Sequence, residues 1–232
     1  MIRDWNKMKY KEFKKLVDGL KQDYLMELFL KQRSSFQIKK EKTIAKNLER
    51  IFTAALSISN KKGFHAMSMR ELSQETKLSI GALYNYFSGK DELLELMQEH
   101  RRTITRKILR DHIDSAKDPS SQLKVGIRIH LYLSEAMVEW FYFSYMEAKN
   151  LNDKARHEAV QSELWSESVF ADIISAGVEK GVFKTEDNIL SASLIKAMLQ
   201  DWYVKRSKYA RRSIDVDMYA DFLIAFIEKS LS

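Results

Sequence analysis

Cysteine is absent from the sequence, which excludes a disulfide framework and a cysteine nucleophile. Only one proline and seven glycines occur among 232 residues, and no alternating apolar pattern indicates a run of strands. These scarcities, together with many Leu, Lys, Glu and Ala residues, predict an all-α protein. The chain is long enough for a sizeable core and for two small domains.

Also missing is any apolar run near the ~20 residues that a bilayer-spanning helix needs. The N-terminal residues are charged throughout and lack the apolar centre of a signal peptide. A cytoplasmic protein without a membrane partner is therefore expected. The five histidines have no metal-ligand spacing, and no Gly-rich phosphate loop occurs. The sequence predicts no catalytic residue, no metal and no cofactor, and it disfavours an enzyme.

Positive charge is concentrated in the N-terminal part of the chain. Residues 1–90 contain 19 Lys and Arg against 9 Asp and Glu, whereas residues 91–232 contain 20 against 23. A basic segment is expected of a surface that binds phosphate groups. Lysine-rich helices that serve solubility are the alternative explanation.

Residues 68–94 predict two short helices joined by a tight turn, followed by the start of a long helix. Ser68 and Glu71 have the spacing of a capping box, so a helix is expected to begin there and to end near Thr76. Upstream, an amphipathic helix is expected over Thr43–Lys61, ended by Gly63 in a left-handed conformation.

The second short helix is expected over about Ile80–Tyr86, with Ser79 as its N-cap. Ser88 and Asp91 repeat the spacing of Ser followed by an acidic residue before the long helix begins. Helix, turn and helix in this order is the outline of a helix-turn-helix motif, whose second helix enters the major groove of DNA.

The segment GALYNYFSGKDELL resembles the recognition helix and its exit in the TetR (tetracycline repressor) family of transcriptional regulators. Seven residues fall on the family's pattern without a gap, namely Gly81, Leu83, Tyr84, Tyr86, Phe87, Lys90 and Leu93. The sequence departs from the family at Lys77, where relatives usually have glycine. A left-handed conformation at that position would cost a lysine about 1 kcal/mol.

The resemblance also implies which residues contact DNA. Contacts to phosphate are implied for Ser68, Arg70, Tyr84, Tyr86 and Lys90, and contacts to base edges for Ser79, Gly81, Ala82 and Asn85. Lys42 stands where many relatives touch phosphate or the minor groove. Packing in the core is the alternative for Tyr84 and Tyr86, and a solvated linker is the alternative for Lys42.

Three successive parts of the chain are expected. Residues 1–40 form a helical N-terminal extension, residues 41–89 a three-helix DNA-binding domain, and residues 90–232 a larger helical domain for ligand binding and dimerisation. Within the extension, apolar residues at steps of three and four predict an amphipathic basic helix over Lys7–Leu30. This helix can pack on the body of the protein, reach DNA as an arm, or bind a partner or a membrane surface.

Downstream, a long helix from Lys90 towards Ile113 is expected to belong to both domains. A break is expected over residues 114–122, which contain the only proline, and later helices at about 121–149, 154–180, 187–208 and 215–230.

The segment Ile127–Tyr145 is apolar on nearly all sides, which is more than one buried helix face requires. An apolar ligand site with a few polar groups is therefore expected, formed by His130, Ser134, Met137, Trp140, Phe141, Ser144 and Trp165. A well-packed core is the alternative. By analogy with TetR relatives, the expected effector is a hydrophobic small molecule such as an acyl-CoA or another lipid-like compound.

The two C-terminal helices are rich in apolar residues, and in the TetR family such helices pair with those of a second subunit. A homodimer interface is expected at Leu194, Met198, Trp202, Phe222 and Phe226. Burial of these residues within one chain is the alternative. The resemblance thus implies a dimeric transcriptional repressor that binds a palindromic double-stranded DNA operator and is released by its effector. The competing hypothesis is an interaction or membrane-surface module that uses the basic N-terminal helix.

Overall fold

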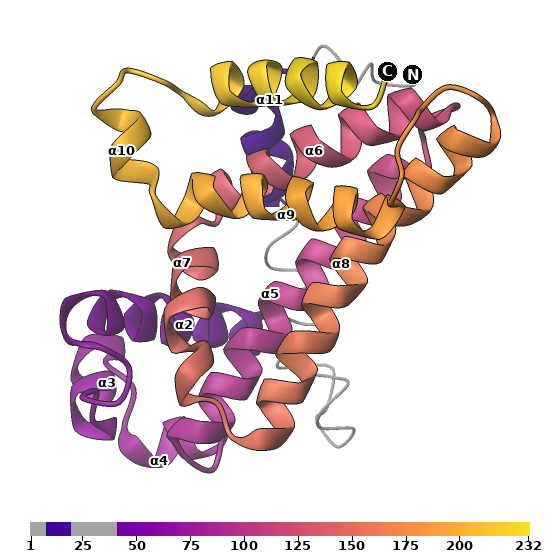
Figure 1. The fold of residues 1–232 in the computed structure, drawn as a ribbon. Coiled ribbons are helices and arrows are strands. Elements are labelled where there is room, and N and C mark those ends of the chain that lie inside the picture. The colour runs from indigo at the N-terminus through magenta and orange to yellow at the C-terminus, as the bar shows by residue number, and fades with distance from the viewer. Residues whose placement is uncertain (1–7, 20–40) are drawn as a thin grey trace. The chain divides into compact units, whose positions relative to one another are not determined.

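The computed structural model describes residues 8–19 and 41–232, and it confirms the all-α fold: no strand occurs in these residues (Figure 1). The side chain of Lys42 and the expected helix beyond residue 19 lie outside the described part. Residues 10–19 form the first described helix. The helices that follow are α2 (Glu41–Lys62), α3 (Met69–Thr76), α4 (Ile80–Tyr84), α5 (Lys90–Ile113), α6 (Pro119–Ala136), α7 (Val138–Glu147), α8 (Asp153–Glu179), α9 (Asn188–Val204), α10 (Arg206–Ala210) and α11 (Val216–Ser230), with a short 3-10 turn at Ala148–Asn150.

The chain divides into two compact units that each combine distant parts of the sequence. The helix-turn-helix unit contains the described residues of Asp18–Ile104 together with Glu139–Arg156. The C-terminal unit contains the described residues of Met1–Val17 together with Thr105–Val138 and His157–Ser232. Consequently α5 contributes its longer N-terminal part to the helix-turn-helix unit and its C-terminal part to the C-terminal unit, and the N-terminal helix belongs to the C-terminal unit up to Val17.

In the helix-turn-helix unit, α3 packs on α2 and on α4. The amide of Gly63 donates to the carbonyl oxygen of Ser59 at 2.8 Å, and Gly63 itself has a φ of 85°, so α2 ends at a left-handed residue as expected. The core of this unit is formed by fully or almost fully buried apolar side chains, among them Leu48, Ile51, Phe52, Phe64, Leu72, Leu83, Phe87 and Leu93.

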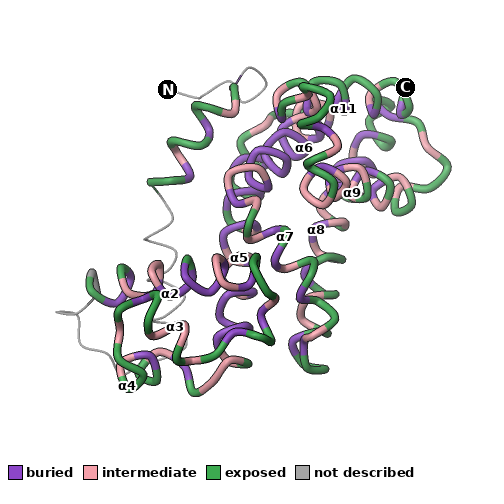
Figure 2. The backbone as a smooth tube through the Cα atoms, turned by 90° about the vertical axis from the view of Figure 1, so that its left-hand side faces the viewer, coloured by how far each residue is buried: buried purple, intermediate pink, exposed green. Residues whose placement is uncertain are grey.

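In the C-terminal unit, α6 packs against both α9 and α11. Every residue from 125 to 134 is buried, and Figure 2 shows the buried colour along most of this helix. This burial explains why the sequence of α6 is apolar on nearly all sides, as is typical of a central helix.

Two helix boundaries differ from those expected. The helix expected at about 121–149 is two helices, because Met137 leaves the helical conformation with φ −125° and ψ 36°. The break before it is shorter than 114–122, since α6 already begins at Pro119 with Asp118 as its N-cap. Proline is favourable at the first helical position because no amide hydrogen is needed there.

Smaller differences occur at the ends of α4 and α9. The helix α4 ends at Tyr84 rather than Tyr86. Before α5, the amide of Ser88 donates to the carboxylate of Glu92 at 2.5 Å, whereas the sequence pattern pairs Ser88 with Asp91. The C-terminal residues of the segment expected at 187–208 form the separate helix α10.

Candidate nucleic-acid interface

The start of α3 is held by a complete capping box. The hydroxyl oxygen of Ser68 accepts from the amide of Glu71 at 3.2 Å, and the amide of Ser68 donates to the carboxylate of Glu71 at 2.9 Å. A hydrogen-bonded ion pair with Lys62, followed by the bonds from Ser68, lowers the pKa of Glu71 to about 2. The Ser68 hydroxyl also donates to Glu71 at 3.0 Å, so this group positions the helix.

The turn between α3 and α4 contains the left-handed residue Lys77, with φ 51° and ψ 28°. Two hydroxyl groups stabilise this turn in place of the glycine that relatives carry. Ser73 donates to the carbonyl oxygen of Leu78 at 2.6 Å, and Thr76 donates to that of Leu72 at 2.6 Å. These bonds connect the end of α3 to the turn and hold the hydroxyl groups of both residues.

The helix α4 presents one face to solvent because Leu83 on its other face is fully buried, as is Phe87 just after the helix. Ser79 caps the helix by accepting from the amide of Ala82 at 3.1 Å. Ser79, Gly81 and Asn85 are exposed, Ala82 is half-buried, and Tyr84 is 47% exposed. The predicted base-edge residues are thus gathered on the leading end and outer face of one short helix.

Tyr86 and Lys90 make contacts within the protein. The phenolic oxygen of Tyr86 accepts from the side-chain amide of Asn47 in α2 at 2.8 Å. The ammonium group of Lys90 donates to the carbonyl oxygens of His65 and Met67 at 2.7 and 3.0 Å. Asn47 was not predicted from the sequence. The only feature of the sequence that could have indicated this role is the position of Asn47, a polar residue next to the apolar face of α2.

The residues predicted to bind an effector are divided between the two units. His130, Ser134, Met137 and Trp165 belong to the C-terminal unit, whereas Trp140, Phe141 and Ser144 belong to the helix-turn-helix unit. Within its own unit, Trp140 packs against His100 and Phe52, with ring centroids 5.1 and 5.4 Å apart.

Arginines of α5 lie over several of these aromatic rings and were missed from the sequence. In the C-terminal unit, the guanidinium carbons of Arg106 and Arg110 lie 5.5 and 5.7 Å from the ring centroid of Trp165. In the helix-turn-helix unit, Arg101 lies 5.4 Å from the ring of Phe141. Arginine over an aromatic face is a favourable cation–π arrangement. Arg106 and Arg110 are four residues apart, a helical spacing that indicated a shared face.

The predicted dimer residues are partly exposed and partly buried. Leu194, Phe222 and Phe226 are 58%, 71% and 53% exposed, while Met198 is half-buried. Trp202 is only 3% exposed. Its indole nitrogen donates to Glu135 at 3.2 Å, and its ring stacks on Tyr209, so Trp202 lies inside the chain and is not available on the exposed face.

A capped helix-turn-helix with an exposed second helix is the arrangement of a DNA-binding protein, and here it is joined to a larger all-helical unit. Residues 51–97 match the family described as bacterial regulatory proteins, tetR family, and residues 116–225 match the one described as tetracyclin repressor-like, C-terminal domain. The chain belongs to the TetR family of helix-turn-helix transcriptional regulators.

Individual relatives share this fold and organisation. The transcriptional repressor KstR of Mycobacterium tuberculosis is 27% identical over 188 residues, which cover 76% of this chain and 80% of that protein. A TetR-family regulatory protein from Rhodococcus RHA1 superposes with a TM-score of 0.71 at 18% identity, covering 81% of this chain and 97% of that one. AibR in complex with isovaleryl coenzyme A and operator DNA superposes with a TM-score of 0.68 at 16% identity, covering 78% of this chain and 97% of the AibR chain.

Two features are absent from residues 8–19 and 41–232. No helix there has both the length and the apolar character to cross a membrane. No group of three or more His, Cys, Asp or Glu side chains there is arranged to hold a metal ion.

Proposed function

We propose that this regulator is a homodimeric repressor, which binds a palindromic operator through α4 and is released by a hydrophobic effector with an anionic group. The observation that carries this proposal is the exposed outer face of α4, held by buried Leu83 and Phe87. The proposed phosphate contacts are Lys42, Ser68, Arg70, Tyr84, Tyr86 and Lys90. The proposed base contacts are Ser79, Gly81, Ala82 and Asn85.

The residue types on α4 favour A·T pairs in the reading of the operator. Asn85 can bind the adenine edge through two hydrogen bonds, and the methyl group of Ala82 can contact the methyl group of thymine. Gly81 has nothing within 4 Å of the position that a Cβ would take, so its surface lets a DNA backbone or base approach closely. No Arg or Lys lies in α4, so hydrogen bonds from an arginine or lysine to guanine must come from other parts of the protein. Recognition of the DNA's shape can supply further sequence preference.

An exposed apolar face supports dimerisation. Leu194 in α9 and Phe222 and Phe226 in α11 are all more than half exposed, and Met198 adds a half-buried side chain. Large exposed apolar side chains of this kind favour protein–protein contacts, and a two-fold dimer buries the same surface on both chains. Two α4 helices spaced by about one DNA turn, roughly 34 Å, would then read the two halves of a palindrome.

The effector is proposed to contact those predicted residues that belong to the C-terminal unit, namely His130, Ser134, Met137 and Trp165. The guanidinium groups of Arg106 and Arg110 over Trp165 favour a ligand with an acidic or phosphate group beside its apolar part. The structure of AibR contains isovaleryl coenzyme A, and such an acyl-CoA combines both properties.

The DNA part of the proposal is tested by selecting duplexes from a random library with the purified full-length protein. A two-fold symmetric sequence should be enriched, and its affinity should fall steeply between about 50 and 200 mM salt. Asn85→Ala should reduce the preference for that sequence, whereas Arg70→Ala should weaken binding to all duplexes alike. Absence of an enriched sequence, or equal binding by both variants and the unaltered protein, would contradict the proposal.

The effector part is tested on the selected duplex. Acyl-CoAs of increasing chain length should release the protein from DNA, while coenzyme A without an acyl chain serves as the control. Arg106→Gln should require a higher acyl-CoA concentration for release at unchanged DNA affinity. Release by coenzyme A alone, or none by any acyl-CoA, would contradict this effector class.

A further inference from the structure

Residues 8–17, here called the strap, dock on the C-terminal unit through an apolar face. Met8, Phe13 and Val17 are 6%, 0% and 0% exposed. The ring of Phe13 contacts those of Tyr132 in α6 and His112 in α5, with centroids 5.7 and 6.4 Å apart. A helix of about ten residues is marginal in water on its own, so its order depends on this docking.

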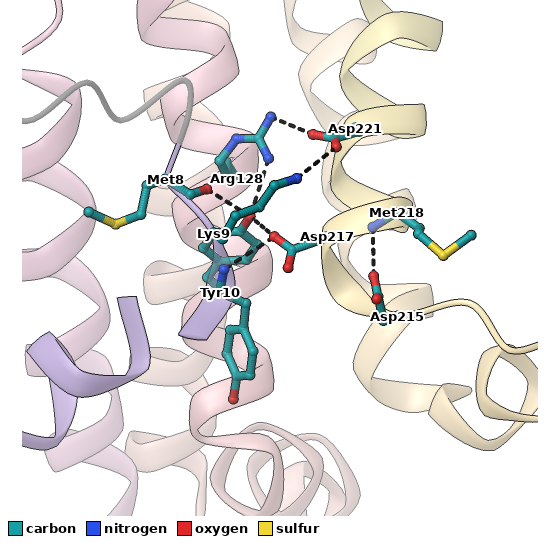
Figure 3. A network of polar contacts seen from close by, with 9 residues as sticks. Met8, Lys9, Tyr10, Arg128, Asp215, Asp217, Met218 and Asp221 are labelled. Atoms are coloured by element: carbon teal, nitrogen blue, oxygen red, sulfur yellow. Dashed lines mark hydrogen bonds and ion pairs between the residues drawn. The ribbon is translucent and has the colours of Figure 1, made fainter. Parts of the chain in front are cut away.

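Polar contacts join the strap to α6 and α11 (Figure 3). The amide of Tyr10 donates to Asp217 at 3.2 Å, and the ammonium group of Lys9 lies 3.5 Å from Asp221. Arg128 of α6 pairs with the same Asp221 at 2.7 Å. Both carboxylates, one helical turn apart on α11, are therefore held by the strap and α6 together.

Tyr132 completes this network from a fully buried position. Its hydroxyl group hydrogen-bonds Asp217 and lies 3.1 Å from the carbonyl oxygen of Met8. The guanidinium group of Arg128 donates to the Tyr132 hydroxyl at 3.2 Å. The strap thus covers a buried phenol that would otherwise meet water, because both Met8 and Phe13 contact this residue.

A different side of α11 carries the exposed apolar residues. Met218, Phe222 and Phe226 are 54%, 71% and 53% exposed, and Met218 and Phe222 directly follow Asp217 and Asp221, about 100° further round the helix. Rotation of α11 about its axis would move both sets of residues together. The buried face of α11 packs on α6, and the bonds to Asp217 and Asp221 add a second constraint on the direction in which the apolar residues point.

We propose that the strap supports the dimerisation surface from within the unit: by binding Asp217 and Asp221 it helps to orient α11 and its exposed apolar side chains for a second copy of this chain. This inference rests on the homodimer proposed above. The strap lies outside both segments that match the TetR family, residues 51–97 and 116–225. The match to the family therefore does not account for the strap.

The test uses full-length Phe13→Asp, which places a charge in the apolar contact with Tyr132 and His112. Amide hydrogen exchange in α11 should become at least ~10-fold faster, and the dissociation constant of the dimer should rise at least ~10-fold. Exchange in α3, which belongs to the other unit, should stay unchanged. Lys14→Ala removes an exposed side chain of the same helix and is the matched control, expected to behave as the unaltered protein.

A second variant, Asp217→Asn with Asp221→Asn, keeps the apolar packing and removes only the two charges. It should accelerate exchange in α11 less than Phe13→Asp but in the same residues. Unchanged α11 exchange in both variants would overturn the role of the strap. An unaltered protein that stays monomeric at every concentration would overturn the homodimer, while α11 exchange still reports whether the strap orients this helix.

Discussion

The ammonium group of Lys90, the first residue of α5, donates a hydrogen bond to the main-chain carbonyl oxygen of Met67 at 3.0 Å. The same group reaches the carbonyl oxygen of His65 at 2.7 Å. Lys90 therefore ties the beginning of α5 to the loop that precedes α3. Because an ammonium group has three donors, one remains for the proposed contact with phosphate.

Replacing Lys90 by alanine should lower both stability and DNA affinity. The loss of two charged hydrogen bonds is expected to cost about 1–3 kcal/mol of unfolding free energy. Chemical denaturation and DNA titration of the same preparation measure the two effects. If Lys90 only contacted phosphate, the alanine variant would bind DNA more weakly but unfold with the same free energy. That result would refute the structural role of Lys90. Arg70→Ala, at an exposed position, is the control for a stability-neutral loss of charge.

Lys77→Gly should stabilise the helix-turn-helix unit, because glycine adopts the observed φ of 51° without strain. The free energy of unfolding should rise by at most about 1 kcal/mol from the relief of backbone strain. The greater freedom of glycine in the unfolded chain reduces this gain. Lys77→Ala retains the Cβ and removes the same charge, so it separates backbone strain from electrostatics. Denaturation midpoints at constant m-value provide the measurement. A glycine variant less stable than the alanine variant would contradict the argument.

The predictions that succeeded depend on residues close together in the sequence. The bounds of α3 and the start of α4 follow from Ser68, Glu71 and Ser79, whose caps involve groups three residues away. The long helix α5 was expected from Lys90 towards Ile113, which are its observed bounds. Local hydrogen-bond chemistry is sufficient to predict such features from a single sequence.

Features that depend on distant residues were not predictable in the same way. No glycine or proline marks the break at Met137, where two helices replace one. The apolar pattern did not distinguish exposed Phe222 from buried Trp202, because the rings that cover Trp202 come from Tyr209 and Tyr219. Similarly, an amphipathic N-terminal helix was evident, but its partners in α6 and α11 lie more than 100 residues away in sequence.

Gly177 near the end of α8 should not tolerate a side chain. A Cβ at this position would lie 2.0 Å from a ring carbon of Phe183, which packs directly on the glycine. Gly177→Ala is expected to destabilise the C-terminal unit by about 1–3 kcal/mol, as is typical of overpacking. The thermal unfolding transition measures the change. Gly89→Ala, where a Cβ would meet nothing within 4 Å, is the matched control, and an equal effect in both variants would contradict the packing argument.

The capping box of α3 should make stability depend on pH in acid. The ion pair with Lys62 and the bonds from Ser68 lower the pKa of Glu71 from 4.5 to about 2. A carboxyl group whose pKa is lower in the folded protein binds its proton more readily when the chain unfolds. Its contribution to stability is hence complete above pH 4.5 and is lost as the pH falls through that value towards about 2.

Glu71→Gln isolates this contribution, since glutamine can still bond the amide of Ser68 but carries no charge for Lys62. The melting temperature of the unaltered protein should exceed that of the variant at pH 6, and the difference should shrink as the pH is lowered from 4.5 towards 2. Comparing the two proteins at each pH cancels the acid titration of their other carboxylates. Glu75→Gln removes an exposed carboxylate from the same helix and should show no such convergence. A difference that stays constant with pH would show that the hydrogen-bonding geometry of Glu71, rather than its charge, stabilises the start of α3.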